Sequence, residues 1–271
     1  FNNLIEMKKF FFLVAAVMAV GAVSVSAQIK LGGKKLDTGK LLDAGSNLAT
    51  AVTLTDAQIA ELCREYIEWS DANNPVSADD SEYSKRLKKL TGNITEVNGM
   101  PVNFKVYEVV DINAFASGDG SIRVFAGLMD VMDDDQLMAI IGHEIGHVVN
   151  TDVKDAMKNA YLAAAAKSAV GATGGKLAAM SESEMADLAL AFSDAQFSQK
   201  QEYAADDYGF NFCINNGYSA YGMASSLEKL VELFESGGTQ ASVVQKMFSS
   251  HPDSAKRAVR VRAKADEYSK K

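Results

Sequence analysis

Two histidines and a glutamate form the part of this sequence with the clearest chemistry. His143 and His147 are four residues apart in the stretch GHEIGH, and Glu144 follows the first histidine. Positions i and i+4 share one face of a helix, so both imidazoles can reach one metal ion at about 2.0–2.1 Å. Glu144 is offset around the helix, which suits a general base acting on water at the metal. The spacing therefore predicts a metal-dependent hydrolase.

A catalytic zinc ion usually has three protein ligands and one open position, so a third ligand must come from elsewhere. The longer pattern HExxHxxGxxH is absent, because Asn150 and Val153 stand where it needs glycine and histidine. A carboxylate is therefore expected, and Glu202 in the stretch QEYAAD is the main candidate. Glu182 and Glu184 remain open as alternatives.

Residues after Glu202 could support this site. Asp206 lies one turn later on the same face of a predicted helix. There it could accept a hydrogen bond from the free N–H of a liganding histidine and so fix the orientation of that ring. Ala204 and Ala205 are small, and we expect them to keep the crossing of the two helices close.

The third histidine, His251, precedes a predicted helix in the stretch SHPDSAKR. Pro252 suits the first turn of that helix, and Arg257 would lie one to two turns into it. A lone histidine in such a place is more often a cap or a buried structural group than a functional residue. Taken alone, this stretch does not assign His251 to the site.

The elements that must position these residues follow from periodicity and capping. Helices are predicted over residues 55–75 and 81–92, the first with a threonine cap. Alternating valines and aromatics predict a strand over 102–111, and further extended structure is expected over 111–130. From Asp133 onward the chain is predicted to be mostly helical. A small sheet followed by many helices gives an α+β fold class.

An alanine- and glycine-rich segment covers residues 160–180. Alanine is the best helix former, so a small-residue helix packed in the core is expected. The alternative is a mobile flap over the site, with Gly171, Gly174 and Gly175 as hinges.

The N-terminal residues have the pattern of a secretory signal peptide. Two lysines after Met7 precede an apolar run that begins at Phe10 and ends in small residues at Ala27. We expect residues 1–27 to be this signal, with residues 1–6 as an upstream extension and cleavage after Ala27. An uncleaved membrane anchor is the alternative.

Export would also change the chemistry of the two cysteines. Cys63 and Cys213 could form a disulfide in an oxidising compartment, or each could be a buried thiol. The formal net charge is −8, which argues against a nucleic-acid partner because such a partner requires a basic face.

Four stretches of this sequence, in this order, resemble the Ste-type zinc metalloendopeptidases, the family of HtpX, the CAAX prenyl proteases, BepA and LoiP. They are NAFASGDGSIRVFAGLM, HEIGH, QEYAAD and SHPDSAKR, and the likeness runs from about Tyr107 to Arg260. The resemblance implies a mostly helical, zincin-like (gluzincin) metallopeptidase domain over residues 53–271. Residues 28–52 would be an N-terminal lead-in to it. The domain would contain a small β-sheet with an edge strand.

The same resemblance implies a ligand set: one Zn²⁺ per chain bound by His143, His147 and Glu202, with Glu144 as the catalytic base. It raises His251 to a catalytic residue, lying over the open zinc position or stabilising the oxyanion.

The resemblance also gives roles to the residues around the ligands. It supports Asp206 as the residue that orients a histidine, and it implies that Arg257 ties its helix to the site. The chain reads SGDGS after the family's substrate-binding strand, where relatives often carry a proline and paired glycines. That strand would bind substrate through Asn113, Ala114, Phe115 and Ala116.

Together these expectations describe an exported zinc endopeptidase, periplasmic or associated with the bacterial cell envelope. Its partners would be misfolded or unassembled envelope proteins, bound in extended form along the edge strand. No membrane span is expected beyond the signal. The alternative is an envelope chaperone or assembly factor that uses the same groove with little proteolysis, or with proteolysis inhibited by His251.

Overall fold

The chain divides into two units, Phe1–Gly45 and Ser46–Lys271. In the first unit, β1 (Lys30–Leu31) pairs in antiparallel fashion with β2 (Lys34–Lys35). The second unit contains all the residues of the predicted site. The stretches that the computed structural model describes are residues 30–31, 34–35, 54–167 and 180–271.

Three predictions fall wholly or largely outside the described residues. They are the signal segment 1–27, the lead-in 28–52 apart from residues 30–31 and 34–35, and the three hinge glycines at positions 171, 174 and 175. The first part of the alanine-rich segment belongs to the helix α7 (Asp152–Lys167), as its composition predicts.

The first two helices in the described part of the chain lie within their predicted ranges, although α3 (Asp56–Asn73) ends two residues before the predicted end at Pro75. Thr55 caps α3, and its hydroxyl and backbone N–H both engage Gln58 in a capping box. Ser81 caps α4 (Glu82–Thr91), which ends at Gly92. The apolar stripe of α3 is buried, so both helices are anchored by the sequence features that predict them.

Three strands form the main sheet of the second unit. Its order is β5 (Asn103–Tyr107), β7 (Ser121–Phe125) and β6 (Ala114–Ala116). β5 runs parallel to β7, whereas β6 runs antiparallel to it. β6 is therefore an edge strand, as expected. A separate hairpin pairs β3 (Glu96–Val97) with β4 (Met100–Pro101).

The predicted strand over residues 102–111 is too long at its C-terminal end. β5 ends at Tyr107 because its partner β7 ends at Phe125, and α5 (Ala126–Val131) follows immediately. Beyond that point the chain leaves the sheet, and the backbone N–H of Glu108 donates instead to the carbonyl of Pro75. Alternating apolar residues alone do not show where a partner strand stops.

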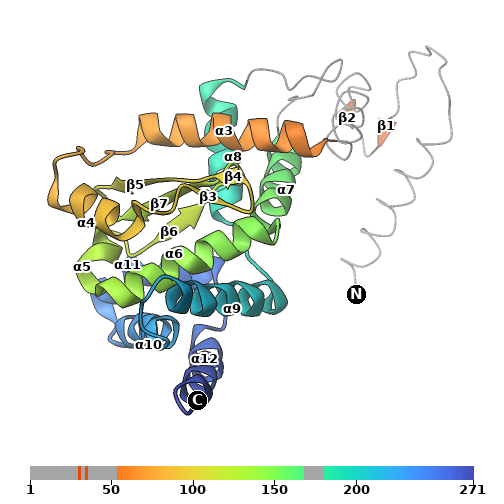
Figure 1. Cartoon of the computed structure of the whole chain (residues 1–271). Coiled ribbons are helices and arrows are strands. Elements are labelled where there is room, and N and C mark those ends of the chain that lie inside the picture. Colours follow the sequence, from red (N-terminus) through yellow and green to blue (C-terminus); the bar gives the residue numbers. More distant parts are fainter. Residues whose placement is uncertain (1–29, 32–33, 36–53, 168–179) are drawn as a thin grey trace. The chain divides into compact units, whose positions relative to one another are not determined.

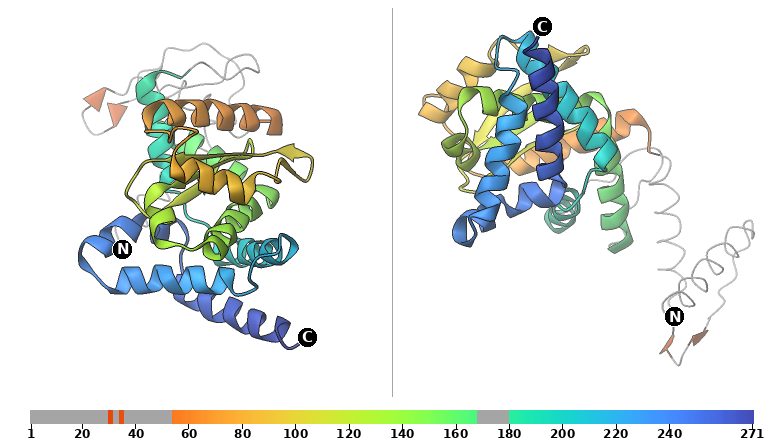
Figure 2. Two further views of the ribbon diagram at one scale, coloured as in Figure 1. Left: turned by 60° about the vertical axis from the view of Figure 1, so that its left-hand side comes forward. Right: turned by 90° about the horizontal axis from the view of Figure 1, so that it is seen from below.

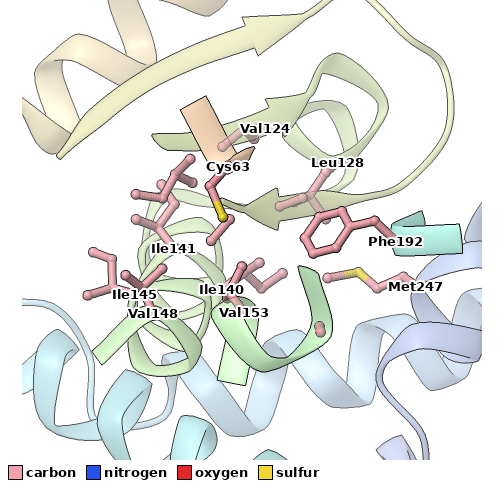
Figure 3. Close-up of a cluster of buried hydrophobic side chains, with 14 of the residues drawn as sticks. Cys63, Val124, Leu128, Ile140, Ile141, Ile145, Val148, Val153, Phe192 and Met247 are labelled. Atoms are coloured by element: carbon pink, nitrogen blue, oxygen red, sulfur yellow. The ribbon is translucent and has the colours of Figure 1, made fainter. Parts of the chain in front are cut away.

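The sheet lies between α3 on one side and α6 on the other (Figure 1), and the turned view agrees (Figure 2). Buried apolar side chains from α3, the sheet and α6 fill the space between them. Figure 3 shows Cys63 of α3 and Val124 of β7 above Ile141 and Ile145 of α6. From Asp134 onward the described part of the second unit is mostly helical, as predicted. The remaining helices in the described ranges are α6 (Asp134–Val149), α8 (Glu182–Ser193), α9 (Gln199–Asn215), α10 (Gly222–Glu235), α11 (Gly238–Ser250) and α12 (Ser254–Tyr268).

Helices α6 and α9 cross closely because small residues line their contact. A Cβ on Gly209 would lie 2.9 Å from the carbonyl oxygen of Ala139 and 3.1 Å from the backbone nitrogen of His143. Ala205 is buried at the same contact, as predicted. Ala204 is exposed on the opposite side of α9, so its predicted role in the crossing is wrong. The close crossing brings the ligand residues of the two helices together.

Cys63 and Cys213 are free, buried thiols. Burial raises the pKa of Cys63 to about 11 and that of Cys213 to about 12. The sequence left open a disulfide or two buried thiols, and the structure has two buried thiols. Within the described ranges, no helix is both long enough and apolar enough to cross a membrane.

Candidate metal centre

Four buried side chains converge between α6, α9 and the end of α11. Each of His143, His147, Glu202 and His251 offers one ligand atom, and these atoms all lie within 4.8 Å of one another. α6 supplies the two histidines from adjacent turns, α9 supplies the carboxylate, and His251 is the C-cap residue of α11. We call these four residues the donor cluster.

The separations within the donor cluster suit a small metal ion. The Nε2 atoms of His143 and His147 are 3.1 Å apart, and Oε1 of Glu202 is 3.3 Å from Nε2 of His147. Nδ1 of His251 lies 3.3 Å from Nε2 of His143 and 3.0 Å from Oε1 of Glu202. Donors bound tetrahedrally at about 2.0–2.1 Å are themselves about 3.4 Å apart. The residues present therefore fit a tetrahedral ion such as zinc.

Hydrogen bonds on the outer side of each ring determine which atoms face the centre. Nδ1 of His143 is 3.1 Å from Oδ1 of Asp206, and Nδ1 of His147 is 2.9 Å from Oδ2 of Asp152. A carboxylate only accepts hydrogen bonds, so each Nδ1 carries a proton and donates it. The Nε2 lone pairs then point at each other and at the Glu202 carboxylate. Such a group of acceptors requires a positive charge among them, either a bound metal ion or a proton on a histidine.

Burial and the contacts between neighbouring side chains shift the pKa values of the donor cluster. Burial lowers the pKa of His143. Burial also acts to lower the pKa of His147, but its hydrogen bonds with Asp152 and Glu202 outweigh this effect and raise the pKa to about 9. Burial acts to raise the pKa of Glu202, yet the three neighbouring histidines hold it well below its usual range. Glu202 is thus a carboxylate at neutral pH.

Arg257 joins three helices around the site. It lies one turn into α12 and is almost fully buried. Its Nη2 and Nε donate to Asp206 over 2.6 and 2.9 Å, and it also forms an ion pair with Glu202. Its Nη1 donates to the carbonyl of His251 over 3.3 Å. Burial acts to raise the pKa of Asp206, but the bonds from Arg257 and His143 lower it to about 2.

The start of α12 differs from the prediction by two residues. Pro252 was expected in the first helical turn, but α12 begins at Ser254. Asp253 has a φ of 62° and lies in the left-handed region, so it interrupts the helix between proline and serine. His251, the C-cap residue of α11, lies two residues before this bend.

Glu144 sits beside the donor cluster rather than in it. Its side chain is buried, and its Oε1 has no hydrogen-bond partner among the described residues. The same atom lies 3.7 Å from Nε2 of His251. A buried carboxylate oxygen without a partner suits a group that must accept a proton from an incoming molecule.

A cavity of about 380 Å³ opens next to Glu144 and His251. The predicted substrate strand lines one side of it, with all four residues from Asn113 to Ala116. Aromatic side chains make up much of the remaining wall, so the cavity is largely apolar. These side chains are Tyr66, Trp69, Tyr107, Phe125, Phe192 and Phe197.

The two alternative carboxylates are held elsewhere. Glu182 accepts a hydrogen bond of 2.7 Å from Nε1 of Trp69. Glu184 accepts one of 2.8 Å from the backbone N–H of Ser181 and caps the start of α8. Neither lies in the donor cluster, whereas Glu202 does.

Sequence reasoning missed two residues that hold His147. Asp152 accepts the proton of its Nδ1, and the ring of Phe197 stacks on its imidazole with centroids 4.0 Å apart. The signal for Asp152 was present: it begins a helix only five residues after His147, across the short break Asn150–Thr151. No local pattern marks Phe197, which lies in the connection between α8 and α9.

Comparison with known proteins agrees with this arrangement. A sequence profile of peptidase family M48 matches residues 81–265, which include the whole donor cluster. Metalloprotease LoiP of Escherichia coli is 40% identical over 242 residues, covering 89% of this chain and 93% of the relative. Metalloprotease YcaL of the same organism is 36% identical over 245 residues, covering 89% and 94%. The beta-barrel assembly-enhancing protease of E. coli is 27% identical over 203 residues, covering 71% and 41%.

Proposed function

Because the chain belongs to peptidase family M48, we propose that it is a zinc-dependent endopeptidase whose metal is held by His143, His147 and Glu202. One observation carries this proposal: the three donors meet beside a buried, unpartnered oxygen of Glu144. Glu144 and His251 line the cavity that the edge strand also lines. Ligands, base and substrate surface therefore adjoin one another.

The chemistry follows from the position of each side chain. His143, His147 and Glu202 would hold a zinc ion, which would supply Lewis acidity for the scissile carbonyl and for the attacking water. Glu144 takes the proton of the attacking water at its free Oε1 and passes it to the leaving amine. His251 lines the same cavity, with its Nε2 3.7 Å from that oxygen, and its role in this proposal is to stabilise the oxyanion that forms as the carbonyl is attacked.

An extended polypeptide is the substrate that this surface suits. β6 uses one edge to pair with β7, and within the described residues no strand pairs with its other edge. A substrate strand can hydrogen-bond along that edge, with alternate side chains entering the apolar cavity. Unfolded chains expose both free backbone and apolar side chains, whereas folded proteins bury them. Misfolded proteins are therefore the proposed substrate class.

The cell envelope is the proposed place of action. The segment 1–27 has a signal-peptide pattern, and one relative is named as a beta-barrel assembly-enhancing protease. Both support export to the periplasm or envelope and a role in degrading misfolded or unassembled proteins there.

Glu144→Gln separates this role from that of a chaperone using the same groove. The amide keeps the shape of the side chain but accepts no proton, so casein cleavage should fall by about 10²–10⁴-fold. Zinc binding should remain, since Glu144 is outside the donor cluster. The variant should also fail to support the cellular role in a deletion strain. Full support from the inactive variant would favour the chaperone, and normal cleavage would remove Glu144 as the base.

A second candidate is a self-inhibited form of the same enzyme. Nδ1 of His251 is 3.0 Å from Oε1 of Glu202 and 3.3 Å from Nε2 of His143, inside the donor cluster. In that position it competes with water and substrate for the fourth place around the ion. Substrate would then have to displace His251 before cleavage.

A further inference from the structure

The carboxylate of Asp152 connects two helices of the site. It is the first residue of α7 and is 6% exposed. Its Oδ2 accepts the Nδ1 proton of His147 over 2.9 Å, and its Oδ1 accepts a hydrogen bond of 2.9 Å from Nε2 of Gln201. Both oxygens are therefore occupied, one by α6 and one by α9.

Both the oxygen and the nitrogen of the Gln201 side-chain amide also form hydrogen bonds. Its Oε1 accepts hydrogen bonds from the backbone N–H of Ser198 over 2.8 Å and from the Ser198 hydroxyl over 2.7 Å. Its Nε2 donates to Asp152. Chemistry fixes this orientation of the amide, since a backbone N–H needs an acceptor and a carboxylate needs a donor. The same bonds cap α9, which carries Glu202 on its next residue.

We propose that Asp152 and Gln201 are positioning residues that form a hydrogen-bond relay between His147 and the capped start of α9. The relay holds the proton of His147 on Nδ1, so Nε2 presents its lone pair to the metal. It also fixes the distance between that histidine and the first turn of α9, where Glu202 lies. This inference rests on the proposed function in one respect only, that the donor cluster binds zinc.

The short turn before Asp152 determines where this residue lies relative to His147. α6 ends at Val149 and α7 begins at Asp152, so only Asn150 and Thr151 connect them. Thr151 has a φ of 65°, a left-handed conformation that is unusual for a β-branched residue. Asp152 follows this residue directly, and the turn leaves its carboxylate in contact with His147.

Reversing the polarity of the relay tests it. In Asp152→Asn, the oxygen can still accept from His147, but the new NH₂ then faces the NH₂ of Gln201. In Gln201→Glu, a carboxylate oxygen faces the carboxylate of Asp152, while the cap of α9 is kept because glutamate also suits that position. The double variant Asp152→Asn/Gln201→Glu pairs the NH₂ of the asparagine with the glutamate oxygen. It also restores the original net charge.

Zinc affinity, measured by competition with a chromophoric chelator, is the first readout. Each single variant should bind zinc about 10–100-fold more weakly, as loss of a bond that orients a ligand does elsewhere. The double variant should return to within about threefold of the natural chain. Asp155→Asn is the matched control, because Asp155 is an exposed acid in the first turn of the same helix. It should leave the affinity unchanged.

The urea midpoint of the metal-free protein is the second readout. It should fall in each single variant, where two like groups face each other, and recover in the double variant. Single variants with normal zinc affinity, or a double variant as weak as the weaker single one, would overturn the relay. If the single variants do not fold, a folded double variant with normal affinity supports the relay and an unfolded one overturns it. A natural chain that binds no zinc would instead remove the proposed function itself.

Discussion

Individual side chains at the metal centre divide into those that sequence spacing reveals and those that it does not. His143, Glu144 and His147 occupy adjacent turns of one helix, so their relation depends only on helical geometry. Asp152 contacts His147 through a turn with a left-handed threonine, and residue types alone do not predict that conformation. Local periodicity therefore indicates ligands better than it indicates the residues that orient them.

Glu202→Ala tests the third ligand at this scale. We expect zinc, measured by mass spectrometry on the purified chain, to fall toward zero because a buried anionic donor has been lost. Glu182→Ala and Glu184→Ala are the matched controls, since both carboxylates bond outside the cluster. Zinc retained in Glu202→Ala but lost in either control would mean that the ligand is wrongly assigned.

His251→Ala tests the two roles of the remaining histidine. If His251 stabilises the oxyanion, kcat for casein should fall by about 100-fold, as it does on loss of other oxyanion donors. The three proposed ligands, His143, His147 and Glu202, remain, so zinc should still bind. A rise in the rate would favour the self-inhibited form, in which the ring of His251 closes the fourth position.

At the scale of helices and strands, capping residues were reliable guides. Thr55 caps the start of α3 as predicted, and α4 ends at Gly92, the last residue of its predicted range. The end of β5 was missed, because it depends on where β7 stops pairing. The start of α12 was missed because Asp253 adopts a left-handed conformation after Pro252. Boundaries set by a residue's own chemistry were therefore predictable, whereas those set by a partner or a strained backbone were not.

The close crossing of α6 and α9 depends on Gly209, which has no side chain. Gly209→Ala would bring a methyl group within 2.9 Å of the Ala139 carbonyl and 3.1 Å of the His143 nitrogen. Separating the helices should cost about 1–3 kcal/mol of unfolding free energy and should also weaken zinc binding.

Urea denaturation of the metal-free protein measures the stability cost at Gly209, and chelator competition measures the change in affinity. Asn211→Ala, at an exposed position of the same helix, is the control and should change neither. An unchanged midpoint and affinity in Gly209→Ala would show that the helices tolerate a wider crossing.

For the whole molecule, a buried ion pair fastens α3 to the sheet. Arg123 of β7 donates to both oxygens of Asp71 over 2.7 and 3.0 Å, and Lys105 of β5 donates to Asp71 over 2.7 Å. Charge patterns along the sequence do not reveal this pairing, because 52 residues separate Asp71 from Arg123. The α+β class was predictable from the order of elements, but the contacts that join α3 to the sheet were not.

This ion pair makes stability depend on pH in acid. Burial acts to raise the pKa of Asp71, but its bonds with Arg123, Lys105 and Tyr107 lower it to about 2. In the unfolded chain the pKa of an aspartate is about 3.9. The Asp71 carboxylate therefore adds about 2 kcal/mol to the unfolding free energy above pH 4 to 5, and this contribution is lost as pH falls toward 2. Urea denaturation with chelator present measures the unfolding free energy of the natural chain and of Asp71→Asn. The difference between the two should become smaller as pH falls over that range. A difference that is constant with pH would contradict the assignment.

The proposed peptidase activity depends on a metal ion bound at the donor cluster. The most direct measurement is the rate of casein cleavage by the purified chain as zinc is removed and returned. We predict that cleavage stops when a chelator has removed the metal and returns with about one equivalent of zinc per chain. Cleavage that persists in protein shown to be free of metal, or a cluster that takes up no zinc, would contradict the central claim.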